Sequence, residues 1–241
     1  MNAGLAEVLA ARIPDQPRWV DLRGLLLSGS GEIFVSPDHE SAAVLSRSLR
    51  FIALWGPPSR RQLEAAIAAA AAGELDVLVD DGSAPQVAPW LPGWERVGAI
   101  LHRAGPTVAA AAVPEAIATV DLDRTTGCDL SGWESPERQE IEWTLAHGRP
   151  AAGVVVESRL VAYCAAAVET ESLWDVSVAT RPEHRRRGLA AACFHHLKSR
   201  LEGKQPVWGS RADNLASRRL AARLGFVPDS TMTAFLRPEG P

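Results

Sequence analysis

The sequence predicts an α/β protein built around a mixed sheet, and three observations support this. In the second half of the 241-residue chain, short apolar runs alternate with segments whose apolar residues recur at helical spacing. Hydrophobic residues make up 46% of the chain and charged residues 22%, which is typical of a chain that forms a core. The length allows one large domain or two smaller ones.

The second half begins with an expected hairpin over residues 154–163, where two apolar runs flank a polar turn. A third strand is expected over 173–179. Arg181-Pro182 should end it, because proline cannot donate to a ladder and restricts the residue before it.

A helix, a strand, a helix and a last strand should follow. The first helix is indicated by apolar residues every four positions from Leu189 to Leu201, and the strand by the short apolar run 206–210. Asp213-Asn214 should cap the second helix and Gly225 should end it, before a final strand over 231–236. Its expected buried stripe is Ala216, Leu220, Ala221 and Leu224.

The first half shows the same alternation of strands and helices less clearly. We expect strands over 51–55, 75–79 and 97–101 and a helix over 60–72. Two explanations stay open: an internal duplication whose first copy has degenerated, or the alternation that any α/β protein shows. The alanine-rich segment 105–113 is the expected boundary. It divides the chain into an α/β domain over 1–112 and a second domain over 113–241.

Composition narrows the classes of partner. The net charge of −4 gives no general attraction to nucleic acid, and no segment has the length and apolarity of a membrane span or the pattern of a secretory signal. The three cysteines are far apart, and we expect them to behave as small apolar residues in a reducing cytoplasm. No metal site is expected, and the oligomeric state is open, a homodimer included.

The loop Arg185-Arg186-Arg187-Gly188-Leu189-Ala190 follows a predicted strand and opens a predicted helix. Free amide groups and the helix dipole favour an anion at such a helix start, and glycine lets the backbone approach a pyrophosphate. A solvated basic turn is the alternative interpretation. A second motif lies downstream, Asn214-Leu215-Ala216-Ser217 at the start of a helix that ends in Leu224-Gly225-Phe226.

These two motifs, in this order, resemble those of the GCN5-related N-acetyltransferases (GNAT), and the residues 179–185 resemble the FR47-like branch. The resemblance covers residues 154–226 and implies the GNAT fold, with a mixed sheet whose parallel strands splay apart. It implies acetyl-CoA as cofactor and an amine as acceptor.

The resemblance also assigns roles to residues. Backbone groups of Val176 and Val178 would bind the pantetheine arm, the loop Arg185, Arg186, Arg187, Gly188, Leu189, Ala190 would bind the pyrophosphate, and Asn214 and Ser217 would contact the pantetheine side. Asp175 is the candidate general base, with Glu169 or Glu171 acting through a water as the alternative.

The family's tyrosine, which donates a proton to the leaving thiolate, is replaced by Ala221. A water, Ser217 or the positioning of both substrates would have to compensate. This departure keeps a second function open, a regulatory module that binds acyl-CoA without turning it over. A nucleotide-binding protein is a third interpretation, although no Walker lysine follows the glycine.

Overall fold

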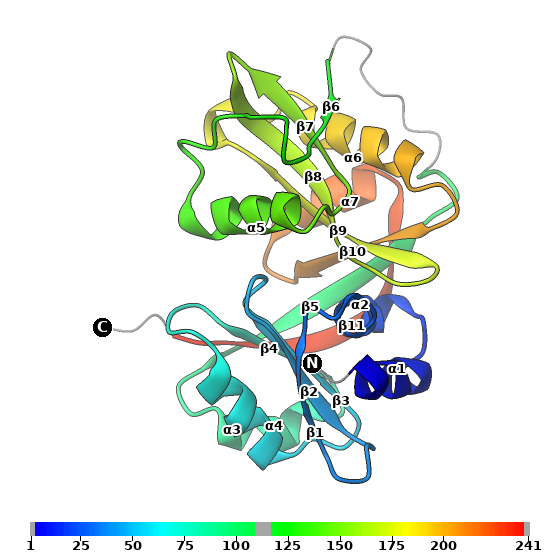
Figure 1. Cartoon of the computed structure of the whole chain (residues 1–241), viewed down its shortest axis with the longest axis vertical. Coiled ribbons are helices and arrows are strands. Elements are labelled where there is room, and N and C mark those ends of the chain that lie inside the picture. Colours follow the sequence, from blue (N-terminus) through cyan, green and yellow to red (C-terminus); the bar gives the residue numbers. More distant parts are fainter. Residues whose placement is uncertain (1–2, 109–116, 239–241) are drawn as a thin grey trace.

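The computed structural model describes residues 3–108 and 117–238. Within these ranges the strands form one mixed sheet in the order β1-β2-β3-β4-β11-β5-β10-β9-β8-β7-β6, with helices on both faces (Figure 1). The predicted α/β class and mixed sheet are confirmed. The expected boundary at residues 112–113 lies outside the described residues, and the two-domain division stays a prediction.

The first half contains the helices α1 (Ala3–Arg12), α2 (Val20–Ser28), α3 (Arg60–Ala69) and α4 (Ala84–Val87). Its strands are β1 (Glu32–Val35), β2 (Ala42–Ser46), β3 (Phe51–Trp55), β4 (Asp76–Asp80) and β5 (Glu95–Ala104). Short 3₁₀ turns occupy Pro17–Trp19 and Ala88–Trp90. The helix predicted over 60–72 ends three residues early, at Ala69.

The second half contains β6 (Val120–Asp121), α5 (Ser135–Ala146), β7 (Ala151–Val156), β8 (Arg159–Glu169), β9 (Leu173–Thr180), a 3₁₀ turn (Pro182–His184), α6 (Leu189–Arg200), β10 (Gln205–Arg211), α7 (Leu215–Arg223) and β11 (Phe226–Leu236). The predicted hairpin turns at Glu157 and Ser158, which both have positive φ, as a two-residue type I′ hairpin turn requires. The last strand begins five residues earlier than predicted. Of the predicted stripe on α7, Ala221 and Leu224 are buried, but Ala216 is exposed because it lies in the first turn, away from the sheet.

The two halves have the same order of elements. In each, three strands pair antiparallel and the third is joined through a helix to a parallel fourth: β1-β2-β3-α3-β4 and β7-β8-β9-α6-β10. The last strand of each half then pairs with the other half, because β11 lies beside β4 and β5 lies beside β10. The centre of the sheet in Figure 1 is therefore an exchange of strands between halves.

Alternation along β8 separates the two faces of the second half. Ala162, Cys164 and Ala166 pack in one cluster with α6 and α7, while Tyr163 and Ala165 pack in another with α5. Helix α2, from the first half, also packs on β8 and β9. The cysteines follow this core, with Cys164 and Cys193 buried and free, whereas Cys128 is only half-buried, contrary to expectation.

Candidate functional site

The parallel strands β9 and β10 pair over only three residues of each strand. The register runs Leu173 with Gln205, Trp174 with Pro206 and Asp175 with Val207, and stops there, although β9 continues to Thr180. The far part of β10 pairs instead with β5 on its other edge. The strands thus separate after Asp175, which opens the sheet beside Val176 and Val178 as the sequence predicted.

The loop from Arg185 to Ala190 lies at the C-terminal end of β9 and leads into α6. Gly188 is the N-cap of α6 with a φ of 80°, a conformation that favours glycine, and no side chain caps the helix. Among the described hydrogen bonds, none uses the amide N–H of Gly188, Leu189, Ala190 or Ala191. These four donors have no acceptor among the described residues, and together with the positive end of the helix dipole they suit a bound anion such as a pyrophosphate.

The three arginines of this loop are exposed. The side chain of Arg185 donates to the carbonyl of Thr180 at 3.1 Å, and Arg187 lies 3.3 Å from the Nδ1 atom of His184. Arg186 has a positive φ of 62°, which strains a non-glycine residue. Leu189 is buried under the sheet and Ala190 is half-buried, so the helix start is held by packing rather than by a side-chain cap.

Helix α7 starts beside the opening between the strands. Asn214 is its N-cap and accepts a hydrogen bond from the amide of Ser217 at 3.0 Å, so the capping role that its position suggested is present. The hydroxyl of Ser217 accepts a hydrogen bond from Trp208 at 2.9 Å. Trp208 is 1% exposed and packs edge-on against Phe226, which fixes α7 against β10.

A cavity of about 360 Å³ lies at the opening. Its walls come from β9 and β10, from Ser217 of α7, from α5, and from α2, β3, β4 and β5 of the first half. Four acidic side chains line it, Asp21, Asp76, Glu140 and Asp175, together with one basic side chain, Arg211. Asp175 is therefore placed in the cavity, and three further carboxyl groups join it that the sequence did not single out.

Burial raises the pKa of each of these carboxyl groups. It raises the pKa of Asp21 to about 6 and that of Asp76 to about 6. It raises the pKa of Asp175 well above its usual range, and the nearby carboxyls of Asp21 and Glu140 raise it further. The cavity therefore favours either a protonated carboxyl or a cation beside a carboxylate.

Glu140 of α5 lies at the cavity wall near two hydroxyl groups. Burial raises its pKa, and the nearby hydroxyls of Ser177 and Tyr163 oppose this shift. Burial and the nearby Glu140 also raise the pKa of Tyr163 well above its usual range, so this phenol keeps its proton. Tyr163 lies on β8, which pairs with β9, and it does not line the cavity.

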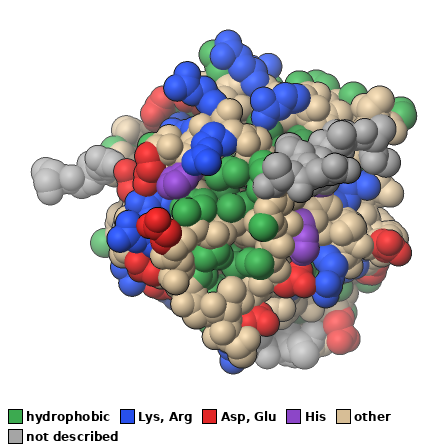
Figure 2. Space-filling view, turned by 90° about the horizontal axis from the view of Figure 1, so that it is seen from above, with side chains coloured by type: hydrophobic (Ala, Val, Ile, Leu, Met, Phe, Trp, Pro, Cys, Tyr) green, Lys and Arg blue, Asp and Glu red, His purple; other side chains and the backbone are tan. Residues whose placement is uncertain are grey.

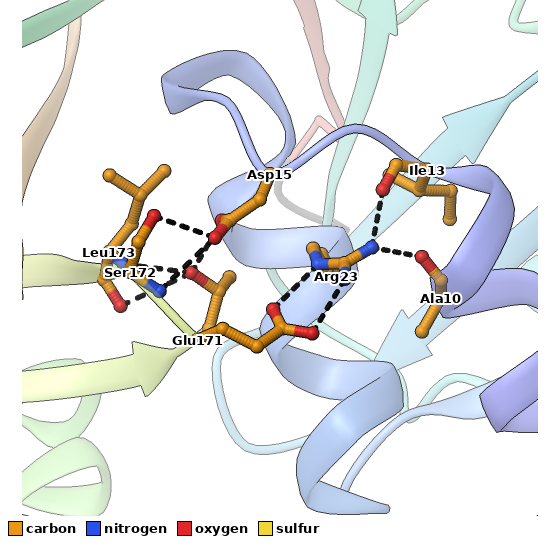
Figure 3. Close-up of polar contacts among 8 residues, drawn as sticks. Ala10, Ile13, Asp15, Arg23, Glu171, Ser172 and Leu173 are labelled. Carbon is orange, nitrogen blue, oxygen red and sulfur yellow. Dashed lines mark hydrogen bonds and ion pairs between the residues drawn. The ribbon is translucent and has the colours of Figure 1, made fainter.

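The position of α2 over the cavity is fixed by a group of polar contacts at the turn between β8 and β9, shown in Figure 3. Arg23 forms a two-point ion pair with Glu171, at 2.8 and 2.6 Å, and donates to the carbonyl groups of Ala10 and Ile13. Asp15 accepts from the hydroxyl of Thr170 at 2.6 Å and from Ser172. Both helices of the N-terminus are thereby attached to the second half, two residues from Asp21.

The same contacts correct part of the sequence analysis. Glu171 is bound to Arg23, and Glu169 forms an ion pair with Lys204 at 2.9 Å, and neither lines the cavity. They are therefore not placed to replace Asp175 as base. Residues 121–134 do not line the cavity either, whereas α2 and β4 of the first half do.

At the end of the molecule seen in Figure 2, several basic side chains gather along one edge, and acidic and basic side chains are mixed elsewhere around apolar ones. His196 lies 2.9 Å from Asp121, and no group of described His, Cys, Asp and Glu residues is arranged to hold a metal ion. No helix within the described ranges is long and apolar enough to cross a membrane.

A sequence model of the GNAT acetyltransferase family matches residues 147–235, which include β7 to β10, the loop before α6 and both motif helices. No curated protein matches the chain.

Solved structures agree over nearly the whole length. A GCN5-related N-acetyltransferase-like protein from Streptococcus suis has a TM-score of 0.72 at 18% identity, covering 98% of this chain and 99% of its own. A protein assigned to the GNAT acetyltransferase family from Novosphingobium aromaticivorans has a TM-score of 0.58 at 25% identity, covering 94% and 98%. A tandem GNAT protein from the clavulanic acid biosynthesis pathway has a TM-score of 0.58 at 18% identity, covering 99% and 95%.

The separated strands, the uncapped start of α6 and the family match all support the GNAT fold. The FR47-like branch stays a prediction. Residues 147–235 match the GNAT acetyltransferase family, the chain has the fold of GNAT structures over nearly its whole length, and these comparisons support an acyl-CoA-dependent acetyltransferase.

Proposed function

We propose that the protein transfers an acetyl group from acetyl-CoA to a primary amine held in the cavity between β9, β10 and the first half. The observation that carries this proposal is the gap after Asp175, because Val176 and Val178 beside it line the acidic cavity and β9 then leads to the loop before α6. A single opening in the sheet then serves both substrates.

The cofactor would lie along the gap. The amides from Gly188 to Ala191 and the side chains of Arg185 to Arg187 would bind its pyrophosphate. Backbone groups of Val176 and Val178 would bond the pantetheine arm, because β10 no longer pairs with them. Asn214 and Ser217 would contact the cofactor from the other side of the gap. The side-chain oxygen of Asn214 already accepts the hydrogen bond that caps α7.

Acetyl-CoA, when bound, supplies a thioester whose acyl carbon accepts the amine. Asp175 takes the proton that the amine loses. A free alkyl amine has a pKa of about 10.4, so only about one molecule in a thousand is nucleophilic at neutral pH. The high pKa of Asp175 makes its carboxylate a stronger base than an exposed aspartate.

Polarisation of the thioester falls to the amide of Val178. Ser217 is the protein group best placed to return a proton to the leaving sulfur. It lines the cavity, and because its oxygen accepts from Trp208, its own hydroxyl proton remains available. Tyr163 does not line the cavity, so its phenol acts through Glu140 and not on the leaving group.

The test is release of free thiol from acetyl-CoA with a panel of primary amines. We expect Asp175→Asn to lower kcat by about 10²-fold, within the range of a lost general base, without weakening acetyl-CoA binding. Asp229→Asn is the matched control, since Asp229 pairs with Arg103, does not line the cavity, and should retain full activity.

If Asp175→Asn released thiol at the wild-type rate, Asp175 would not be the general base. Tight acetyl-CoA binding with no thiol release from any amine would instead favour the second candidate, a binding module without turnover, for which the absence of the family tyrosine at Ala221 is the supporting observation.

We also propose that the first half is a degenerate GNAT repeat. The repeated order of elements supports this, as does the equal extent of the two parallel pairings, since β3 and β4 also pair over only three residues. The loop before α3 contains Pro57-Pro58 where the second half has its arginines. Prolines have no amide N–H, so this loop lacks donors for a pyrophosphate.

A further inference from the structure

The cavity beside Asp175 is more acidic than one general base requires. Four carboxyl groups line it and only Arg211 opposes them, while the Arg211 guanidinium is itself 3.3 Å from Asp213. These carboxyls come from four separate elements, α2, β4, α5 and β9. They are brought together only when the two halves meet.

Two of these groups have unused hydrogen-bonding capacity. The Oε1 atom of Glu140 is buried and has no partner among the described residues. Asp21 forms no hydrogen bond or ion pair among the described contacts, although burial raises its pKa to about 6. A buried carboxyl without a partner destabilises the fold, so an arrangement of this kind is typical of a site that gains its partner from a ligand.

The carboxyls differ in the cavities that they line. Asp21 and Asp175 line only this cavity, and Asp175 interacts electrostatically with both Asp21 and Glu140. Asp76 and Glu140 line this cavity and also a neighbouring one of about 560 Å³, so they stand where the two cavities meet. No group of described residues converges as metal ligands would, which favours an extended organic cation over a metal ion.

We propose, on the basis of the acetyltransferase function above, that the acceptor is a small aliphatic amine with a second positively charged amino group. Its reacting nitrogen lies beside Asp175 and Asp21, and its distal ammonium lies between Asp76 and Glu140. The volume of about 360 Å³ suits a small molecule, and the junction with the neighbouring cavity leaves room for a longer polyamine.

Calorimetric titration of the CoA-saturated protein with three probes of equal length tests this: 1,4-diaminobutane, 1-aminobutane and 4-aminobutanoate. They carry a distal positive charge, no distal charge and a distal negative charge. We expect the diamine, or its three- to six-carbon homologues, to bind at least about tenfold more tightly than the matched monoamine, which corresponds to about 1.4 kcal/mol. The aminocarboxylate should bind most weakly.

Glu140→Gln and Asp76→Asn should each reduce the preference for the diamine at least about tenfold. Glu64→Gln removes the same charge from an exposed ion pair on α3 and should keep the preference. Two substitutions are used so that loss of folding in one does not decide the result, and thermal unfolding checks each protein.

Equal binding of the diamine and the monoamine, or no binding of either, would overturn this inference. So would a preference that Glu140→Gln and Asp76→Asn leave unchanged. Thiol release separates the two proposals. Turnover without a diamine preference contradicts the inference and leaves acetyl transfer standing, whereas diamine binding without turnover supports the inference and contradicts acetyl transfer.

Discussion

At the scale of single residues, the carboxyl groups that line the cavity destabilise the folded state when they are ionised. Asp21 has no hydrogen-bond or ion-pair partner among the described residues, and its pKa of about 6 in the folded chain exceeds the value of about 3.8 that an exposed aspartate has. A carboxyl group whose pKa is higher in the folded chain than in the unfolded chain stabilises the fold only while the carboxyl is protonated. For Asp21 this stabilisation is complete below pH 3.8 and is lost as the pH rises through about 6, because the carboxyl then ionises.

Asp21→Asn should therefore stabilise the protein at pH 8, by about 1–3 kcal/mol, and should have almost no effect near pH 4. The neutral amide removes the buried charge and its repulsion of Asp175. Urea unfolding of both proteins at the two pH values measures this. A variant less stable than wild type at pH 8 would show that Asp21 has an unrecognised favourable partner.

At the scale of elements, α2 connects the first half to the catalytic strands. It packs on β8 and β9 and carries Asp21, and its attachment depends on Arg23, whose side chain is 12% exposed. Arg23 bonds two carbonyls at the end of α1 and the carboxylate of Glu171 (Figure 3). Removing it would leave several polar groups without partners.

Arg23→Ala should lower the free energy of unfolding by about 2–4 kcal/mol and raise the KM for the amine, because α2 carries one wall of the cavity. Arg60→Ala is the comparison, since that exposed pair with Glu64 on α3 should contribute no more than about 0.5 kcal/mol. Urea unfolding and steady-state kinetics are the measurements. Equal effects of the two substitutions would mean that the contacts of Arg23 do not hold α2.

At the scale of the whole molecule, the exchange of β5 and β11 makes the two halves depend on one another. The sheet centre consists of ten paired positions between β5 and β11, and each of these strands also extends the other half's sheet. Neither half can complete its sheet alone.

Calorimetry should accordingly show a single cooperative unfolding transition, with a calorimetric enthalpy equal to the van't Hoff enthalpy. Two separate transitions would contradict the exchange of strands as the link between the halves.

The sequence predicted those structural features that depend on local residue patterns. The hairpin, β9, α6 and the cap at Asn214 follow from alternation, helical spacing and turn residues, and Gly188 was placed correctly at a helix start. Asp21, Asp76 and Glu140 could not be found in this way. Their role depends on the packing of α2, β4 and α5 around one gap, and nothing in their local sequence specifies that contact.

The exchange of strands was equally hidden, because the residues 97–101 and 231–236 are ordinary strand sequences that fit either half. Ion pairs argue against Glu169 and Glu171, which the sequence left only as alternatives to Asp175. Their neighbours Lys204 and Arg23 come from distant segments.

The most direct measurement is a calorimetric titration with acetyl-CoA of the wild type, Gly188→Val and Gly203→Val. Both glycines have positive φ, 80° and 88°, so both substitutions strain the backbone, but Gly203 lies in an open turn away from the α6 loop. We predict one acetyl-CoA per chain, a loss of affinity of at least about 30-fold for Gly188→Val, and wild-type affinity for Gly203→Val in folded protein. Unchanged affinity in Gly188→Val would contradict the binding of the cofactor at the start of α6.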